Sequence, residues 1–140
     1  MSNALHFETT EGKNIINTAN AMADAAREAI LPLFRSRSLV AENKTFNGFD
    51  PVTDADKSAE RAMITELKQR RPNDGVFGEE FGELEGDSLY RWILDPIDGT
   101  RAFMAGAPTW GVLISVEKIG NGSIFGIIDQ PFIGERFWGG

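Results

Sequence analysis

The chain has 140 residues, no cysteine, one histidine (His6) and a formal net charge of −7. This length suits one domain or less and can bury a core without disulfides. The composition excludes thiolate metal sites and a cysteine nucleophile, while a Ser/His/Asp triad would need a histidine from the N-terminal tail. An acidic chain is also a poor partner for nucleic acid or anionic membranes.

Targeting and membrane signals are absent from the sequence. No apolar run approaches the roughly 20 residues of a membrane span, and residues 1–10 lack the regions of a signal peptide. We therefore expect a cytoplasmic protein that does not bind membranes.

Two helices are predicted in the first half of the chain. Apolar residues recur with helical spacing between residues 11 and 34, and Pro32 should bend or end that helix. A polar, irregular segment at 36–47 follows and carries Lys44. The second helix should begin after Thr53, with Asp56 as the acidic member of a capping box, and end near residue 71. The local sequence favours capping over catalysis for Asp56, and both roles stay open.

Residues 76–81 (VFGEEF) predict a short strand that ends in two acids, Glu79 and Glu80. Neighbours on an extended segment point to opposite faces, so we expect only one of the pair to enter a given site. Residues 83–88 are expected to form a loop.

The most informative stretch is YRWILDPIDGTRAF at 90–103. Its start predicts a buried strand, and Pro96 should turn the chain out of the sheet. Asp95 and Asp98 would then converge, which is costly unless protons or a hard cation such as Mg²⁺ offset their charge. The amides after them, at Gly99 and Thr100, could face phosphate; an ordinary turn with an N-cap is the alternative.

Further strands are predicted at 109–117, 124–129 and 135–138, with a hairpin turn at 120–123. The fold class is therefore α+β, with two long helices packed on a mainly antiparallel sheet. We expect residues 1–140 to be the N-terminal, metal- and phosphate-binding part of a single incomplete domain, because nothing follows the last strand to cover a second sheet face.

Acidic residues gather at three places in this layout, namely Asp50 with Asp56, Glu79 with Glu80, and Asp95 with Asp98. Carboxylates at separate element ends, beside a Gly-Thr turn and without histidine, suit phosphoryl transfer at a site with two metal ions.

Three motifs carry a family resemblance: DPVTDAD at 50–56, GEE at 78–80 and WILDPIDGTRAF at 92–103. In order and spacing they resemble the lithium-sensitive, Mg²⁺-dependent inositol monophosphatase superfamily. The resemblance implies the layered α/β sugar-phosphatase fold, hydrolysis of a small phosphate ester by a metal-activated water, two to three Mg²⁺ ions, inhibition by Li⁺ and a homodimer.

The resemblance also implies roles for individual residues. The metal ligands would be Glu79, Asp95, the carbonyl of Ile97, and Asp98. The catalytic residues would be Asp56, Thr100 and Glu79, with Thr100 and Asp56 deprotonating the attacking water. Phosphate or substrate would contact Gly99, Thr100 and Arg101. The supporting residues around the metals would be Lys44, Asp50 and Glu80.

Within the superfamily, Arg101, PTWG at 108–111 and DQPFIGERFWG at 129–139 resemble the histidinol-phosphatase branch. The implied reaction is histidinol phosphate to histidinol, in histidine biosynthesis; the alternative is an inositol-1-monophosphatase or related sugar phosphatase. A later family motif of the WDxAAG type is absent from these residues, so we expect little activity from this chain alone.

Two other interpretations remain. The haloacid dehalogenase class also places two aspartates before Gly-Thr, but two residues apart rather than three, and the first attacks phosphorus. The second is an inactive fragment or a metal-binding interaction module.

Overall fold

The computed structural model describes residues 5–37, 39–44 and 51–140. Its two long helices are α1 (Thr10–Ile30) and α2 (Asp54–Arg70), and the short helix α3 spans Thr100–Met104. A 3₁₀ turn, η1 (Leu31–Leu33), continues α1 and contains Pro32, as the sequence predicts. Among the helices that the structure describes, none combines the length and apolar character needed to cross a membrane.

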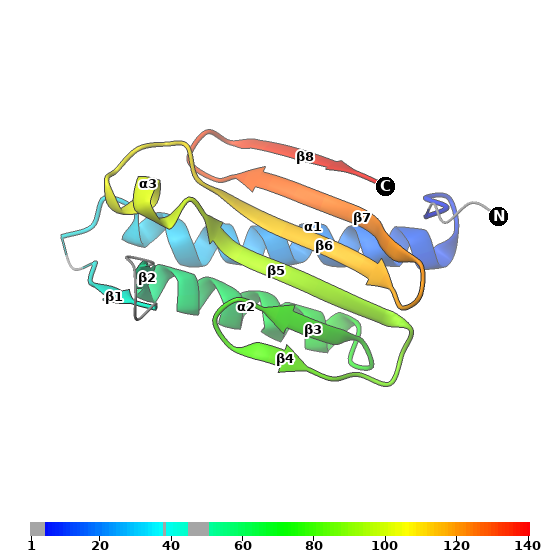
Figure 1. The fold of residues 1–140 in the computed structure, drawn as a ribbon. Coiled ribbons are helices and arrows are strands. Elements are labelled where there is room, and N and C mark those ends of the chain that lie inside the picture. The colour runs from blue at the N-terminus through cyan, green and yellow to red at the C-terminus, as the bar shows by residue number, and fades with distance from the viewer. Residues whose placement is uncertain (1–4, 38, 45–50) are drawn as a thin grey trace.

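Six strands form the main sheet, in the order β4-β3-β5-β6-β7-β8 (Figure 1). Their bounds are β3 (Gly75–Gly78), β4 (Gly82–Leu84), β5 (Tyr90–Asp98), β6 (Gly111–Lys118), β7 (Gly122–Gln130) and β8 (Glu135–Gly139). The β3–β5 pair is parallel and every other pair in this sheet is antiparallel. The predicted fold class, two helices on a mainly antiparallel sheet, is confirmed.

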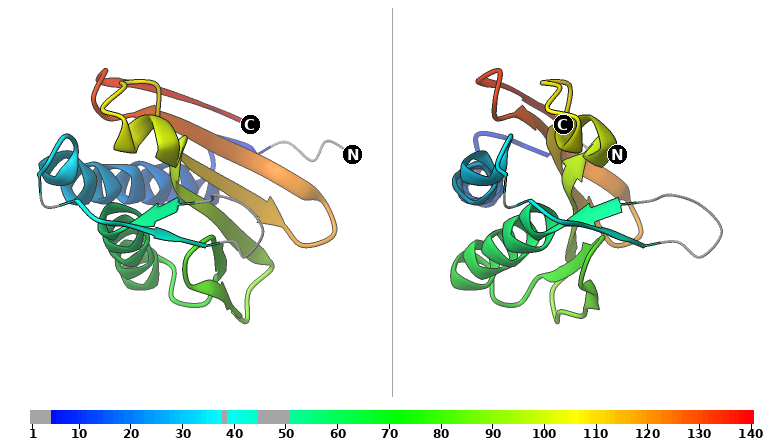
Figure 2. Two further views of the ribbon diagram at one scale, coloured as in Figure 1. Left: turned by 60° about the vertical axis from the view of Figure 1, so that its left-hand side comes forward. Right: turned by 90° about the vertical axis from the view of Figure 1, so that its left-hand side faces the viewer.

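Helices α1 and α2 lie side by side on one face of the sheet (Figure 2). The core between the two layers is apolar, and Trp92, Trp110, Phe103 and Phe125 are its largest buried side chains. On the opposite face no element among the described residues covers the strands, and Phe137 and Ile128 are exposed there.

The sequence misses a small two-stranded sheet. Strands β1 (Ala41–Asn43) and β2 (Pro51–Thr53) pair antiparallel. Strand β1 lies in the segment 36–47, which the sequence predicted to be irregular. The burial pattern of β1 is exposed throughout, so no apolar alternation marks it.

The chain also stays in the sheet past Pro96, contrary to prediction. Strand β5 runs to Asp98, with an irregular register against β6 between Asp95 and Asp98. Proline is tolerated at such a bulge because its missing N–H is not needed for a regular ladder there. Asp95 and Asp98 therefore lie at the irregular end of a strand rather than in a separate loop.

Candidate active site

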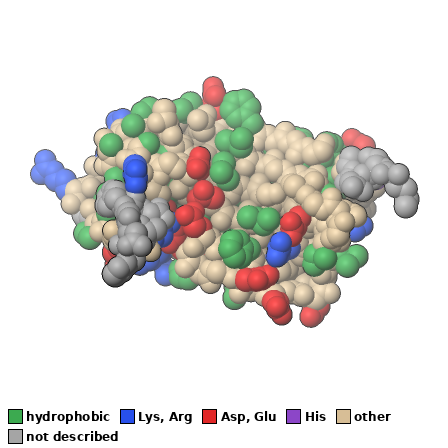
Figure 3. Space-filling model, in the orientation of Figure 1, with side chains coloured by type: hydrophobic (Ala, Val, Ile, Leu, Met, Phe, Trp, Pro, Cys, Tyr) green, Lys and Arg blue, Asp and Glu red, His purple; other side chains and the backbone are tan. Residues whose placement is uncertain are grey.

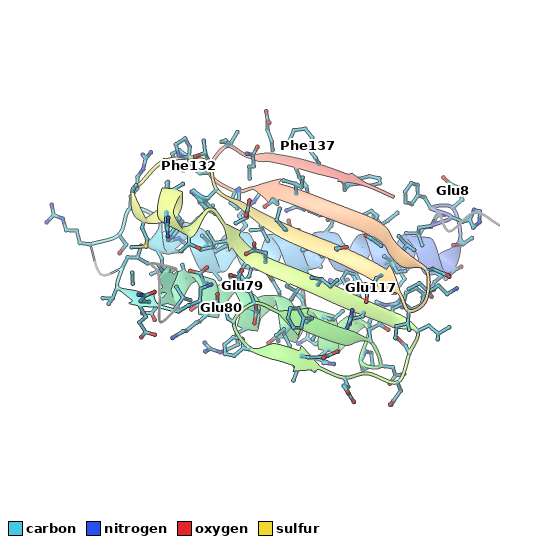
Figure 4. The ribbon with its side chains drawn as sticks, in the orientation of Figure 1. Glu8, Glu79, Glu80, Glu117, Phe132 and Phe137 are labelled. Atoms are coloured by element: carbon cyan, nitrogen blue, oxygen red, sulfur yellow. The ribbon has the colours of Figure 1, made fainter. Side chains whose placement is uncertain are left out.

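The three motif segments meet at one end of the sheet. Strands β3 and β5 are parallel, so both finish at this end, where Gly78 lies opposite Leu94. The N-terminus of α2 and the whole of α3 lie at the same end (Figure 1). Figure 4 shows Glu79 and Glu80 side by side between β5 and α2. Figure 3 shows acidic side chains gathered on the same face of the molecule.

Asp56 forms the capping box that the sequence predicts. Its Oδ2 accepts hydrogen bonds from Thr53 N at 2.9 Å and from Thr53 Oγ1 at 2.7 Å, while Asp56 N donates to Thr53 Oγ1 at 3.3 Å. The residue is only 1% exposed. Burial raises the pKa of the Asp56 carboxyl, although the hydrogen bonds from Thr53 oppose the rise.

Thr100 meets the other oxygen of the same carboxylate. Thr100 Oγ1 lies 3.4 Å from Asp56 Oδ1 and 3.1 Å from the carbonyl oxygen of Ile97. The hydroxyl has one proton to donate, so these two acceptors compete for it. A small rotation about the Thr100 side chain is enough to change the acceptor.

Glu79 and Asp95 share a proton across the parallel strand pair. Burial and a hydrogen bond to Glu79 raise the pKa of Asp95 to about 7. Burial also raises the pKa of Glu79, but hydrogen bonds from Lys44 and Asp95 outweigh it and leave that pKa lowered. The second oxygen of Asp95, Oδ1, is buried without a hydrogen-bond partner.

Lys44 supplies positive charge to this acidic end. Its Nζ donates to Glu79 Oε1 at 2.7 Å and to Glu80 Oε1 at 3.1 Å. Burial alone would lower the pKa of Lys44, but these two carboxylates raise it. The ammonium thus holds two glutamates that would otherwise repel each other.

The sequence predicted that Glu79 and Glu80 end a strand, but the structure places them after it. Strand β3 stops at Gly78, and the two acids lie in the turn to β4. Because a turn does not impose the alternation of an extended segment, both carboxylates reach Lys44. Both acids thus contact the same cationic side chain, while Glu79 alone is hydrogen-bonded to Asp95 among the contacts of the described residues.

Gly99 turns the chain from β5 into α3. Its backbone is left-handed, with φ 87° and ψ 43°, a conformation that glycine adopts at little cost. The turn leaves Asp98, Gly99 and Arg101 exposed at this end and Thr100 half-buried. Asp50, the remaining acid of the first motif, lies outside the described residues.

The donor set fits a hard cation such as Mg²⁺. Carboxylate and carbonyl oxygens are its preferred ligands, and the buried Oδ1 of Asp95 lacks any partner. Within residues 5–37, 39–44 and 51–140, however, no three acidic or histidine side chains are already grouped as a metal site. The shared proton and Lys44 offset the negative charge instead.

A hollow of about 590 Å³ lies on the open face of the sheet, next to the acidic end. Its lining comes from β5 to β8 and is apolar except for Asp95 and Ser115. It offers no cationic side chain to a phosphate. The acidic end, rather than this hollow, is the place for phosphate chemistry.

Glu60 was not singled out from the sequence, although it is fully buried beneath this turn. The available signal was its position: it lies on the face of α2 that also buries Asp56, Met63 and Leu67. An acid on a buried helical face needs hydrogen-bond partners, and backbone amides of the turn at 79–81 supply them.

Comparison with known proteins agrees with this geometry. A sequence model of the inositol monophosphatase family matches residues 11–140. A histidinol-phosphatase from Streptomyces coelicolor is 37% identical over 126 residues, covering 88% of this chain and 46% of that protein. An inositol-1-monophosphatase from Caulobacter vibrioides is 38% identical over 120 residues, covering 84% of this chain and 47% of that protein.

Among solved structures, an inositol monophosphatase from Zymomonas mobilis is 41% identical and superposes with a TM-score of 0.72. The match covers 93% of this chain and 48% of that one. The chain thus spans about half the length of the curated relatives named above. These matches favour the three-motif interpretation over the haloacid dehalogenase alternative.

Proposed function

The chain belongs to the inositol monophosphatase family, and on that premise we propose that it is the N-terminal, metal- and phosphate-binding part of a Mg²⁺-dependent phosphomonoesterase. One observation carries the proposal: two close side-chain pairs, Thr100 with Asp56 and Glu79 with Asp95, link all three motif segments at one end of the sheet. Because the chain covers about half the length of its relatives, we propose the activity for a protein as long as those relatives (a family-length protein).

The cation would be held by Glu79, Asp95, Asp98 and the carbonyl of Ile97. That carbonyl accepts from Thr100 Oγ1 at 3.1 Å, and a carbonyl oxygen has two lone pairs. When bound, Mg²⁺ lowers the pKa of a coordinated water and offsets the charge of the phosphate. Lys44 and Glu80 support Glu79, since the ammonium fixes both glutamates from the side.

Thr100 and Asp56 would act on the attacking water. Thr100 Oγ1 accepts the water proton as its own proton passes to Asp56 Oδ1, so one O–H bond breaks for each that forms. Asp56 Oδ2 stays bound to Thr53 throughout, which keeps the accepting oxygen in place. A raised pKa makes this carboxylate a better proton acceptor than an ordinary aspartate.

The phosphate would lie against the amides of Gly99 and Thr100, with Arg101 beside it. The left-handed backbone of Gly99 supports this assignment, because it ends the strand and turns the next residues toward the site. Arg101 is exposed and follows directly, so its guanidinium can reach an anionic or polar part of the substrate.

The substrate we propose is histidinol phosphate, hydrolysed to histidinol. Relatives named histidinol-phosphatase reach 37–39% identity over most of this chain, which supports the choice. An inositol phosphate is the second candidate, because relatives named inositol-1-monophosphatase are 38% identical over 120 residues and 42% identical over 89 residues.

The deciding experiment compares kcat/KM for histidinol phosphate and inositol-1-phosphate, with Mg²⁺, in a family-length protein carrying these residues. We expect a preference for histidinol phosphate. A tenfold preference for the inositol ester would overturn the substrate, and hydrolysis of neither ester would overturn the function.

A further inference from the structure

Glu60 is a fully buried acid that contacts the turn between β3 and β4. It belongs to α2, and its exposed fraction is 0%. The turn above it comprises residues 79–81, which carry Glu79 and Glu80 of the candidate site. A buried carboxylate without partners would be strongly destabilising, so its contacts define what it does.

Its partners are backbone amides. Glu80 N lies 3.0 Å from Oε1 and 3.2 Å from Oε2 of Glu60, and Phe81 N donates to Oε2 at 2.6 Å. Hydrogen bonds to an ionised acceptor are shorter and stronger than neutral ones. Both oxygens are used, so the carboxylate fixes two successive peptide units of the turn.

The space around the carboxylate is closed by Gly78. A Cβ atom on that residue would lie 2.3 Å from Cδ of Glu60 and 2.4 Å from its Oε2. No side chain larger than hydrogen therefore fits while Glu60 keeps its position. The glycine of the GEE motif is explained by this close approach.

A second residue of α2 holds the same turn from outside. The guanidinium of Arg61 lies 5.4 Å from the centre of the Phe81 ring, within the range of a cation–π contact. Glu60 thus contacts the backbone of the turn, and the next residue, Arg61, contacts the side chain of Phe81. The turn is attached to α2, whose first turn also carries Asp56.

We propose that Glu60 is a positioning residue that holds the turn 79–81 so that the Glu79 carboxylate faces Asp95, where both would help to hold a cation. This rests on the proposed function, since it assigns Glu79 to the cation. Groups that orient metal ligands from behind typically change metal affinity by 10–100-fold when they are removed. The expected effect is therefore on cation affinity more than on folding.

The test uses a family-length protein that carries these residues, with Mn²⁺ as the probe, and measures free Mn²⁺ by electron paramagnetic resonance. Glu60→Gln replaces one acceptor oxygen with an NH₂ group, so that one backbone N–H of the turn faces another donor instead of an acceptor. Gly78→Ala displaces the carboxylate without changing it. Glu66→Gln is the matched control, because Glu66 lies on the same helix and, within the part of the chain that the structure describes, its carboxylate pairs with Arg70 of the same helix. Hydrogen exchange of residues 79–82 is measured on each variant.

We expect Glu60→Gln and Gly78→Ala each to raise the Mn²⁺ dissociation constant about tenfold and to speed exchange in the turn. Glu66→Gln should match the unchanged chain. If Glu60→Gln does not fold, Gly78→Ala decides alone. Unchanged Mn²⁺ affinity in both variants would overturn the positioning role, whatever their Tm, whereas no Mn²⁺ binding by the unchanged family-length protein would overturn the proposed function beneath it.

Discussion

Thr100 Oγ1 lies 3.4 Å from Asp56 Oδ1, although 44 residues separate the two in sequence. The same carboxylate caps α2 through its other oxygen, Oδ2, which binds Thr53. Capping of α2 and acceptance of a proton are therefore compatible roles for Asp56, because each uses a different oxygen of its carboxylate.

Thr100→Ala should abolish most of the activity in a family-length protein. The substitution removes the hydroxyl that links the attacking water to Asp56, and such proton-transfer groups contribute about 10²–10⁴-fold to rate. We expect kcat to fall by at least 10²-fold with little change in Tm. Thr65→Ala is the control, since that hydroxyl only bonds the Arg61 carbonyl within α2. Full activity in Thr100→Ala would contradict the proposed proton path.

Thr53→Ala should destabilise the chain more than the equivalent change at the other helix cap. Thr9 caps α1 by accepting a bond from Gly12 N, and its hydroxyl donates to the carbonyl oxygen of His6 at an exposed position; losing such a cap costs about 1 kcal/mol. Thr53 instead donates its hydroxyl to the buried carboxylate of Asp56. Urea unfolding should give a loss of about 2 kcal/mol for Thr53→Ala, towards the upper end for caps. Equal losses at the two sites would show that the Thr53–Asp56 bond adds nothing.

The metal-free chain should lose stability as the pH rises from about 4 to about 7. The unfolded pKa of aspartate is about 3.9, and the folded pKa of Asp95 is about 7. A raised pKa means that the folded state binds the proton more tightly, so stability is fully present below pH 4 and is lost up to pH 7. Glu79, whose pKa is lowered, acts in the opposite direction and at lower pH.

Asp95→Asn isolates this effect. The variant keeps the shape of the side chain but cannot ionise, so the fall in Tm between pH 4 and 7 should become smaller. At pH 7 without metal, the variant should be more stable than the unchanged chain, and millimolar Mg²⁺ should stabilise only the unchanged chain. Thermal unfolding across this pH range measures both. An identical pH profile in the two proteins would contradict the shared proton.

Asp129→Ala should be among the most destabilising substitutions away from the site. Asp129 is 0% exposed and accepts from Arg27 Nη2 at 2.6 Å and Arg136 Nε at 2.9 Å, which links α1, β7 and β8. Breaking a buried ion pair costs about 3–5 kcal/mol. Glu117→Ala, which breaks a more exposed pair with Arg91, should cost less than about 1 kcal/mol. Mn²⁺ affinity should not change in either variant.

Periodicity and capping explain why so much of the fold was predictable. The apolar stripe of α1 and the Thr53–Asp56 box of α2 are local signals, and both appear where the sequence placed them. Alternation likewise identified β6, whose residues Val112, Ile114 and Val116 are buried on one face. The three motifs also indicated residues that lie near one another, since Thr100 contacts Asp56 and Glu79 contacts Asp95.

The errors occur where distant contacts override local sequence. Pro96 remains in the sheet because β6 pairs around it with a shifted register. Strand β1 forms from exposed residues because β2 lies beside it. Glu60 was not singled out from the sequence, because the amides that satisfy its carboxylate lie some 20 residues away. None of these partners lies within the span of a local pattern.

The parallel pairing of β3 with β5 sets the approach of Glu79 to Asp95. Gly78 lies opposite Leu94, so each acid follows directly after a paired residue. The loop after β4 joins the starts of the two strands, because Ser88 N donates to the carbonyl oxygen of Asn73 at 2.9 Å and Ser88 Oγ donates to Asp74 Oδ1 at 2.7 Å. It lies at the opposite end of β5 from Asp95 (Figure 1). A change of length in this loop should therefore act on the two acids only through the register of the strand pair.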